Sequence, residues 1–274
     1  CIFSIMEYNE INFIENSQYQ WGKMSKLLHL KKFICKVLTC WMPYKQRILY
    51  REALYWFSFS DYCRFKHANY HIVSLGTNCM PRGLTTAAKL KPRRFYGEKS
   101  CPFDTSENHH LDRISELIET DFIDYFDRLV KEQPLFPHDY DLPDNEFYKR
   151  YQNRIKNFLE IMQSEKLIYF IHSDYLKVPL RKDILHLYDV LERKRQGKPF
   201  KLILLTSEYI DNLPNIIQLP EKFTIDDGCW LVHIINEYGD YNSKYTQYCK
   251  KMKKRLEQII YMESADSSKT STVE

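Results

Sequence analysis

The chain has 274 residues and a mass of 33.2 kDa, which suits one large domain or two small ones. Apolar residues make up 44% of it and Gly and Pro are few, which excludes collagen-like and low-complexity chains. No stretch approaches about 20 uncharged apolar residues, so no transmembrane helix is expected. The net charge is +4, and residues 1–51 alone carry +5. Because the rest of the chain is nearly neutral, no nucleic-acid partner is expected.

The eight cysteines point to free thiols. No two of them form a C-x-x-C pair, and the chain is large enough to fold without disulfides. A cytoplasmic protein is therefore expected. The spacing of the cysteines and histidines matches no standard metal pattern, so the sequence predicts neither a metal nor a cofactor.

The composition divides the chain into four parts. Residues 1–23 are expected to be a disordered or non-native leader, because the Met-Ser-Lys that follows resembles a natural translation start. Residues 24–66 are expected to form a basic helical arm, with apolar residues at helical spacing over 26–41. This helix can lie on the inner face of a membrane or on a partner, or pack on the domain. The core domain is expected over 67–262, and a disordered tail over 263–274.

Strand and helix patterns alternate along the core domain. Continuous apolar runs predict strands buried on both faces, as in parallel sheets, at 70–75, 167–172, 200–206 and 229–235. Helical periodicity lies between and after them, at 82–90, 109–130 with a break near Asp121, 144–164, 179–196 and 244–262. The alternation predicts an α/β fold with a mainly parallel sheet flanked by helices, of the Rossmann-like, three-layer kind.

Residues 74–79, with the sequence SLGTNC, join the first strand to a helix. Asn78 is expected to cap this helix, which places Cys79 at a helix N-terminus and at the carboxyl end of a strand. Open α/β sheets bind ligands at that edge. The helix dipole and the N–H groups of the first turn favour a thiolate and can stabilise an oxyanion. Cys79 is therefore the candidate nucleophile, and the alternative is an inert thiol in a tight turn.

A nucleophilic cysteine usually needs a base. His138, in the loop FPHDY, is the first candidate, and the adjacent Asp139 is the candidate group to orient its ring. A surface His–Asp pair is the alternative interpretation. His172, at the end of the strand expected over 167–172, is the second candidate base.

Two arginines stand one helical turn apart on the long helix. Arg150 and Arg154 can together bind a carboxylate or phosphate of a substrate, or can pair with Asp144, Glu146 or a surface acid. The loop CPFD ends in a carboxylate that can reach the same site. The residues predicted to bind substrate are Asn78, Asp104, Arg150, Arg154 and His172.

The SLGTNC turn, the CPFD segment, the FPHDY loop and the Arg-bearing helix follow one another over roughly residues 70–210. In this order they resemble an uncharacterised bacterial family of papain-like cysteine peptidases, whose members are often associated with surface-polysaccharide genes. The resemblance implies Cys79 as nucleophile and His138 as general base, supported by Asp139 or Asp104. It also implies a second possible fold, a papain-like α+β domain with an antiparallel sheet.

We therefore expect a cysteine-nucleophile hydrolase or acyltransferase linked to surface-polysaccharide metabolism. Its substrate is an unidentified small molecule, peptide or glycan with an amide or ester bond. Two alternatives stay open. One is a non-catalytic module that binds a glycan or sugar phosphate in a membrane-associated assembly. The other is a metal-dependent enzyme that uses Cys79, His138 and Asp139.

Overall fold

The structure is a computed structural model, and it falls into two compact units. One unit comprises Cys1–Lys66 and Thr224–Lys250, and the other, the core unit, comprises His67–Phe223 and Lys251–Glu274. The structure describes residues 37, 40, 68–76, 79–88, 90–91, 99–104, 110–127, 139, 142–173, 179–222, 248 and 250–261.

Several predictions lie outside the described residues. These are the leader, nearly all of the arm, the tail, the strand expected over 229–235, and the site residues Asn78 and His138. Residues 224–250, which the sequence pattern assigns to the core domain, fall in the other unit.

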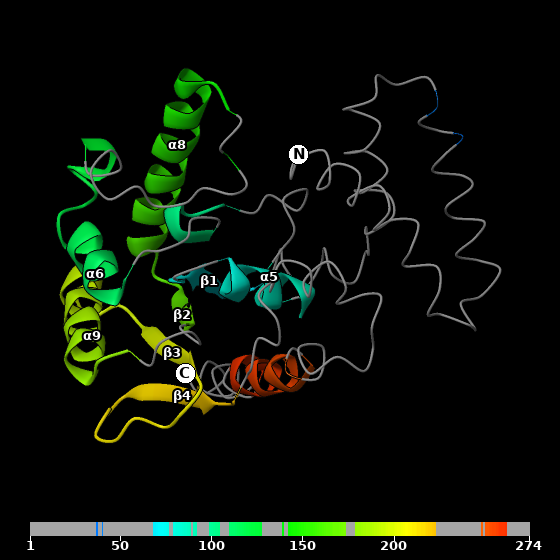
Figure 1. Cartoon of the computed structure of the whole chain (residues 1–274), viewed down its shortest axis with the longest axis vertical. Helices are drawn as coiled ribbons and strands as arrows, with labels where there is room; N and C mark the ends of the chain where they lie inside the picture. The colour runs from blue at the N-terminus through cyan, green and yellow to red at the C-terminus, as the bar shows by residue number, and fades with distance from the viewer. Residues whose placement is uncertain are drawn as a thin grey trace, which may run out of the picture. The chain divides into compact units, whose positions relative to one another are not determined.

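Four parallel strands form the sheet of the core unit (Figure 1). They are β1 (Tyr70–Ser74), β2 (Leu167–Ser173), β3 (Phe200–Thr206) and β4 (Ile216–Pro220). Each strand pairs in parallel with the next, so the order in the sheet is β1-β2-β3-β4. This confirms the α/β class and the parallel sheet. The four described strands do not form the antiparallel sheet of the papain-like alternative.

Strand β4 was not predicted from the sequence. It is short, it ends in a proline, and only two of its five residues are buried, so it lacks the continuous apolar run of β2 and β3. It follows β3 through residues 207–215 without an intervening helix. Because β4 is the last strand in the described order, Pro220 removes no hydrogen bond from the interior of the described sheet.

The helices of the core unit lie close to the predicted ranges. They are α5 (Met80–Ala87), α6 (Leu111–Glu119), α8 (Asp144–Met162) and α9 (Arg181–Arg195), and residues 251–261 are also helical. A short 3₁₀ helix, η2 (Pro102–Asp104), occupies a segment that the sequence predicts as a loop. Helix α6 stops as predicted, because Asp121 and Phe122 just beyond it have positive φ angles of 52° and 62°. Among the described helices, none has the length and apolarity to cross a bilayer.

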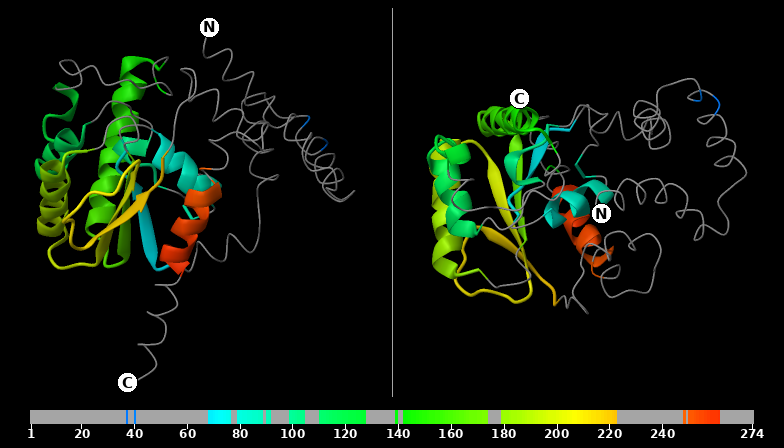
Figure 2. Two further views of the ribbon diagram at one scale, coloured as in Figure 1. Left: turned by 60° about the horizontal axis from the view of Figure 1, so that its bottom comes forward. Right: turned by 45° about the horizontal axis from the view of Figure 1, so that its top comes forward.

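Helices cover both faces of the sheet (Figure 2). Helices α6 and α9 lie on one face, and α5 and the helical segment 251–261 lie on the other. The strand register explains the division. Val73, Phe170 and Leu202 stand side by side and join the core with α6, α8 and α9. Side chains alternate along a strand, so the residues between these positions face α5. On that face the hydroxyl of Ser173 in β2 donates to the sulfur of Met80 at 3.4 Å.

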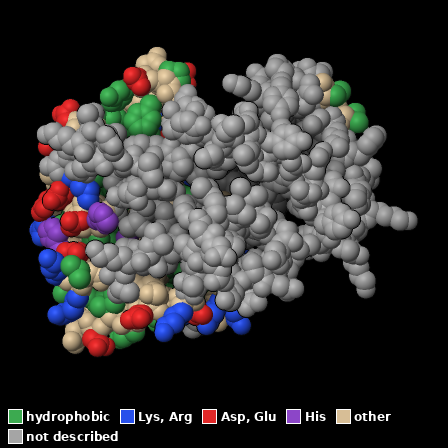
Figure 3. All heavy atoms as spheres, in the orientation of Figure 1, with side chains coloured by type: hydrophobic (Ala, Val, Ile, Leu, Met, Phe, Trp, Pro, Cys, Tyr) green, Lys and Arg blue, Asp and Glu red, His purple; other side chains and the backbone are tan. Residues whose placement is uncertain are grey.

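The outer surface of α6 and α9 carries charged side chains of both signs, which are interspersed on the described part of the face in Figure 3. Arg193 pairs with Glu119 at 2.6 Å and Lys194 with Asp121 at 2.8 Å, which joins the end of α9 to the end of α6. Exposed pairs of this kind contribute about 1 kcal/mol or less. The stability of this face therefore depends on the apolar core beneath it.

Candidate functional site

Cys79 lies just past the carboxyl end of β1, at the start of α5. Its side chain is partly exposed. The prediction that Asn78 caps the helix is wrong, because Cys79 itself occupies the cap position and no side chain caps α5. Pro81 has no N–H, so the first turn offers only the backbone donors of Met80 and Arg82.

Two buried serines lie beneath the first turn of α5. The register pairs Ser74 with Ile171, so Ser74 and Ser173 face the same side of the sheet. Ser173 bonds the sulfur of Met80, whereas the Ser74 hydroxyl meets no partner among the described groups. The sequence did not single out either serine. Both hydroxyls therefore lie between the strand ends and α5, the helix that Cys79 begins.

His172 is completely buried near the carboxyl end of β2. Its Nδ1 bonds the carbonyl oxygen of Leu75. Because a carbonyl only accepts, Nδ1 carries the proton of this hydrogen bond. Side chains alternate along a strand, so His172 projects from the face opposite to Ser173 and α5. His138, although outside the described residues, is therefore the base that we retain for Cys79.

Asp104 is the centre of a buried charge cluster. Its side chain is only 1% exposed, and it accepts hydrogen bonds from the ammonium of Lys91 at 2.9 Å and the backbone N–H of Cys101 at 2.7 Å. The guanidinium of Arg82, on α5, lies 3.8 Å from the same carboxylate. Burial by itself raises the pKa of Asp104, but the charges of Lys91 and Arg82 outweigh burial and hold this pKa below its usual range. Asp104 is thus an ionised group that is bound within the protein.

Cys101 contrasts with Cys79. It is fully buried, and burial, aided by the negative charge of Asp104, raises the pKa of its thiol to about 12. A buried thiol with so high a pKa stays protonated and inert near neutral pH. Of these two cysteines at the core of the site, only Cys79 has the exposure that a nucleophile needs.

Asp139 is held by three side chains of α8. Arg150 bonds one of its carboxylate oxygens. The other oxygen accepts Arg154 at 2.8 Å and the hydroxyl of Tyr151 at 2.9 Å. Burial opposes ionisation of Asp139, but Arg154, Tyr151 and Arg150 together hold its pKa below the usual range. The two arginines therefore bind an acid of the protein itself. That acid is the buried Asp139, which the sequence did not suggest as their partner.

Arg154 is influenced by the charges of both Asp139 and Asp104. Burial lowers the pKa of Arg154, but Tyr151, Asp139 and also Asp104 raise it above its ordinary value. Close to this point, Asn157 of α8 donates to the backbone carbonyl of Ser100 at 3.1 Å. Within the Asp104 cluster, Arg82 belongs to α5, so the charge of Asp104 acts on both α8 and the start of α5.

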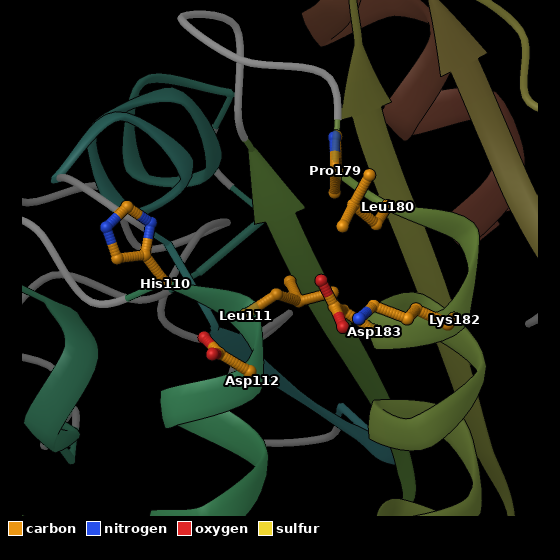
Figure 4. Close-up of a pocket in the computed structure, with 7 residues that line it drawn as sticks. All are labelled: His110, Leu111, Asp112, Pro179, Leu180, Lys182 and Asp183. Carbon is orange, nitrogen blue, oxygen red and sulfur yellow. The ribbon is translucent and has the colours of Figure 1, made fainter.

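A separate pocket of about 310 Å³ lies where α6 and α9 begin (Figure 4). Neither helix is capped by a side chain. None of the residues predicted to act at the Cys79 site lines this pocket. Its lining comprises His110, Leu111, Asp112, Pro179, Leu180, Lys182 and Asp183.

Sequence reasoning missed three members of the site, Arg82, Lys91 and Tyr151. Lys91 gave no signal, because nothing in the sequence distinguishes a buried lysine from an exposed one. Tyr151 stands between the two arginines, where the periodicity counts it only as part of an apolar helix face. Within the described ranges, no three His, Cys, Asp or Glu side chains gather closely enough to hold a metal ion.

The Cys79–His138 pair remains a prediction, because His138 lies outside the described residues. Comparison of the chain with models of known families, with curated proteins and with solved structures finds no match. The resemblance to the papain-like family therefore depends on the motifs alone, and function has to be argued from the site.

Proposed function

We propose that this protein is a thiol-dependent acyl hydrolase or acyltransferase with Cys79 as its nucleophile. One observation carries the proposal: a partly exposed cysteine begins a helix at the carboxyl edge of a parallel sheet. Ligands of open α/β sheets bind at this edge. The positive end of the helix dipole stabilises a thiolate there, which makes Cys79 more nucleophilic near neutral pH.

The proposed reaction has two steps. His138 takes the thiol proton, and the sulfur of Cys79 attacks the acyl carbon of an amide or ester. The C=O electron pair moves onto oxygen, and backbone N–H groups of the first turn of α5 stabilise this oxyanion. The oxyanion then collapses to a thioester, and the departing amine or alcohol takes the proton from His138. Water or an acceptor hydroxyl or amine attacks the thioester and restores the Cys79 thiol.

An acyl-trapping experiment tests this proposal. We expect p-nitrophenyl esters of short acyl chains to release one nitrophenolate per chain in a burst and to leave one acyl group on the Cys79 peptide, as read by mass spectrometry. Cys79→Ala abolishes the burst. Cys40→Ala, which removes an exposed cysteine outside the core unit, leaves the burst unchanged. Acylation spread over several cysteines, or a burst that persists in Cys79→Ala, contradicts the proposal.

The pocket at the starts of α6 and α9 favours a second candidate, the non-catalytic binding of a glycan or sugar phosphate. The carboxylates of Asp112 and Asp183 can accept hydrogen bonds from sugar hydroxyls, and Lys182 can bind a phosphate. The same experiment separates the two candidates, since a binding module would leave Cys79 without an acyl group.

The proposed enzyme works in the cytoplasm, as its free-thiol composition favours. In this proposal, the basic segment 26–41 contacts the inner face of the membrane or a partner protein. The link to surface-polysaccharide metabolism is supported only by the resemblance of the motifs.

A further inference from the structure

The pocket of about 310 Å³ where α6 and α9 begin has the size of a small-molecule site. The two helices run in the same direction, because Arg193 in the last turn of α9 pairs with Glu119 at the end of α6. Since α9 follows β2 along the chain, both helices begin at the carboxyl edge of the parallel sheet. Ligands of open α/β sheets bind at this edge. The pocket therefore lies where the fold favours a ligand.

Polar and apolar side chains alternate around the pocket. Leu111 of α6 and Asp183 of α9 point toward one another across it (Figure 4). Leu180, which directly precedes α9, is 53% exposed and offers an apolar surface to a ligand. Within the described ranges, the side chains of Lys182 and Asp183 form no hydrogen bond or ion pair with the protein. Their charged groups are therefore available to a ligand.

The fixed charges of the pocket cancel. Asp112 and Asp183 lie in the first turns of α6 and α9, where each carboxylate offsets the positive end of its own helix dipole. The two helix ends contribute about +0.5 each and Lys182 contributes +1, against −2 from the two carboxylates. With His110 neutral, the sum is close to zero. No excess positive field is left to attract a phosphate, and no excess negative field is left to attract an amine.

We propose that this pocket binds a neutral sugar. The carboxylates of Asp112 and Asp183 accept hydrogen bonds from sugar hydroxyls, and the ammonium of Lys182 donates to a hydroxyl oxygen. The C–H groups of the sugar ring pack on Leu111 and Leu180. A hydroxyl both donates and accepts, so a single sugar ring satisfies carboxylates and ammonium together.

This inference goes beyond the acyl chemistry proposed for Cys79 and does not depend on it. It also narrows the ligand of the second candidate function, because a pocket without net charge gives a sugar phosphate no advantage over the neutral sugar. The two carboxylates repel the phosphate, whereas the one ammonium attracts it.

Saturation-transfer NMR with the full chain at pH 8 tests the inference. The probes are glucose, galactose, mannose and N-acetylglucosamine, each with its 1-phosphate and 6-phosphate. We expect at least one neutral sugar to bind with a Kd of about 1 mM or below. Both phosphates of that sugar should bind about tenfold more weakly, and a rise in salt concentration should leave binding of the neutral sugar unchanged.

Variants on α9 locate the bound sugar. We expect Asp183→Asn to weaken binding about tenfold, since it replaces a charged acceptor with a neutral amide. Asp189→Asn is the matched control, because Asp189 is exposed on the same helix but does not line the pocket. It should bind the sugar as the wild type does. If Asp183→Asn does not fold, Leu180→Ser takes its place and should weaken binding several-fold, as expected for the loss of an apolar contact.

Three results would overturn the inference. One is that none of the four neutral sugars binds. Another is that a sugar binds equally well to wild type, Asp183→Asn and Leu180→Ser, which places it elsewhere. The third is that a sugar phosphate binds more tightly than its sugar and loses this advantage in Lys182→Gln, which makes the pocket an anion site.

Cys79→Ala separates this inference from the proposed function. The variant should bind the sugar as the wild type does, although it cannot be acylated. If it loses the sugar, the ligand sits at the Cys79 site and the inference fails, whereas the acyl-trapping result still decides the proposed function. If acyl trapping fails but Asp183→Asn weakens sugar binding, the pocket stands and the acyl chemistry does not.

Discussion

Replacing Arg195 with methionine is expected to lower the free energy of unfolding by about 3–5 kcal/mol. The side chain of Arg195 is 1% exposed and donates to four backbone carbonyls. The acceptors, at 2.6, 2.8, 3.1 and 3.0 Å, are the carbonyls of Met162, Ser164, Lys166 and Pro199. They lie at the end of α8 and directly before β2 and β3, so one guanidinium holds three elements together at the amino edge of the sheet.

Methionine fills a similar volume but removes the donor of these carbonyls, one of which, that of Pro199, also accepts the backbone N–H of Ile168. An unsatisfied buried polar group costs about 1–3 kcal/mol. Denaturant unfolding followed by circular dichroism measures the loss. Arg193→Met is the matched control, because Arg193 is in the last turn of the same helix and, among the described residues, forms an exposed pair with Glu119. We expect the control to lose about 1 kcal/mol or less. Equal losses in the two variants would contradict the role assigned to Arg195.

Asp104→Asn is expected to destabilise the protein by about 3–5 kcal/mol at pH 7, because it leaves the charge of Lys91 buried without a counter-ion. The effect has a defined pH dependence. The folded-state pKa of Asp104 lies below its ordinary value of 3.8, so its contribution is present above that value and is lost as pH falls through the folded pKa. The difference in the free energy of unfolding between wild type and Asp104→Asn should therefore disappear at acidic pH.

The variant should also recover stability in alkali. Burial lowers the pKa of Lys91 below 10.5, so deprotonation relieves the buried charge as pH rises through the folded pKa towards that value. Unfolding curves between pH 3 and pH 10 check both limits. Glu160→Gln, which removes an exposed carboxylate bound by Lys99, is the control and should cause little change at any pH. If the difference in the free energy of unfolding between wild type and Asp104→Asn does not change with pH, Asp104 acts through packing alone.

The parallel sheet could be predicted because β2 and β3 consist of apolar residues on both faces, a pattern that only a doubly covered sheet requires. Strand β4 could not, since most of its residues are only partly buried. The start of α5 was predicted within two residues, although its cap was not. Gly76, Thr77 and Asn78 mark a turn, but they do not determine which residue begins the helix.

The ion pairs of the site could be predicted only in part. The helical repeat places Arg150 and Arg154 on one face, but it does not show that Asp139, outside the repeat, is the acid that they bind. Lys91 and Asp104 are 13 residues apart in a segment without regular periodicity. Their burial follows from how α5 and η2 pack on the sheet. Packing between segments that are distant in the sequence cannot be predicted from the local sequence.

The measurement that most directly tests the central claim is the rate of Cys79 alkylation against pH, in wild type and in His138→Ala, with every cysteine followed by peptide mass spectrometry. Cys101 is the internal reference, since the folded protein should protect it. The account predicts an apparent pKa for Cys79 well below about 8.5 that rises in His138→Ala. A slow or ordinary thiol in wild type, unchanged by the loss of His138, would show that Cys79 is not an activated nucleophile.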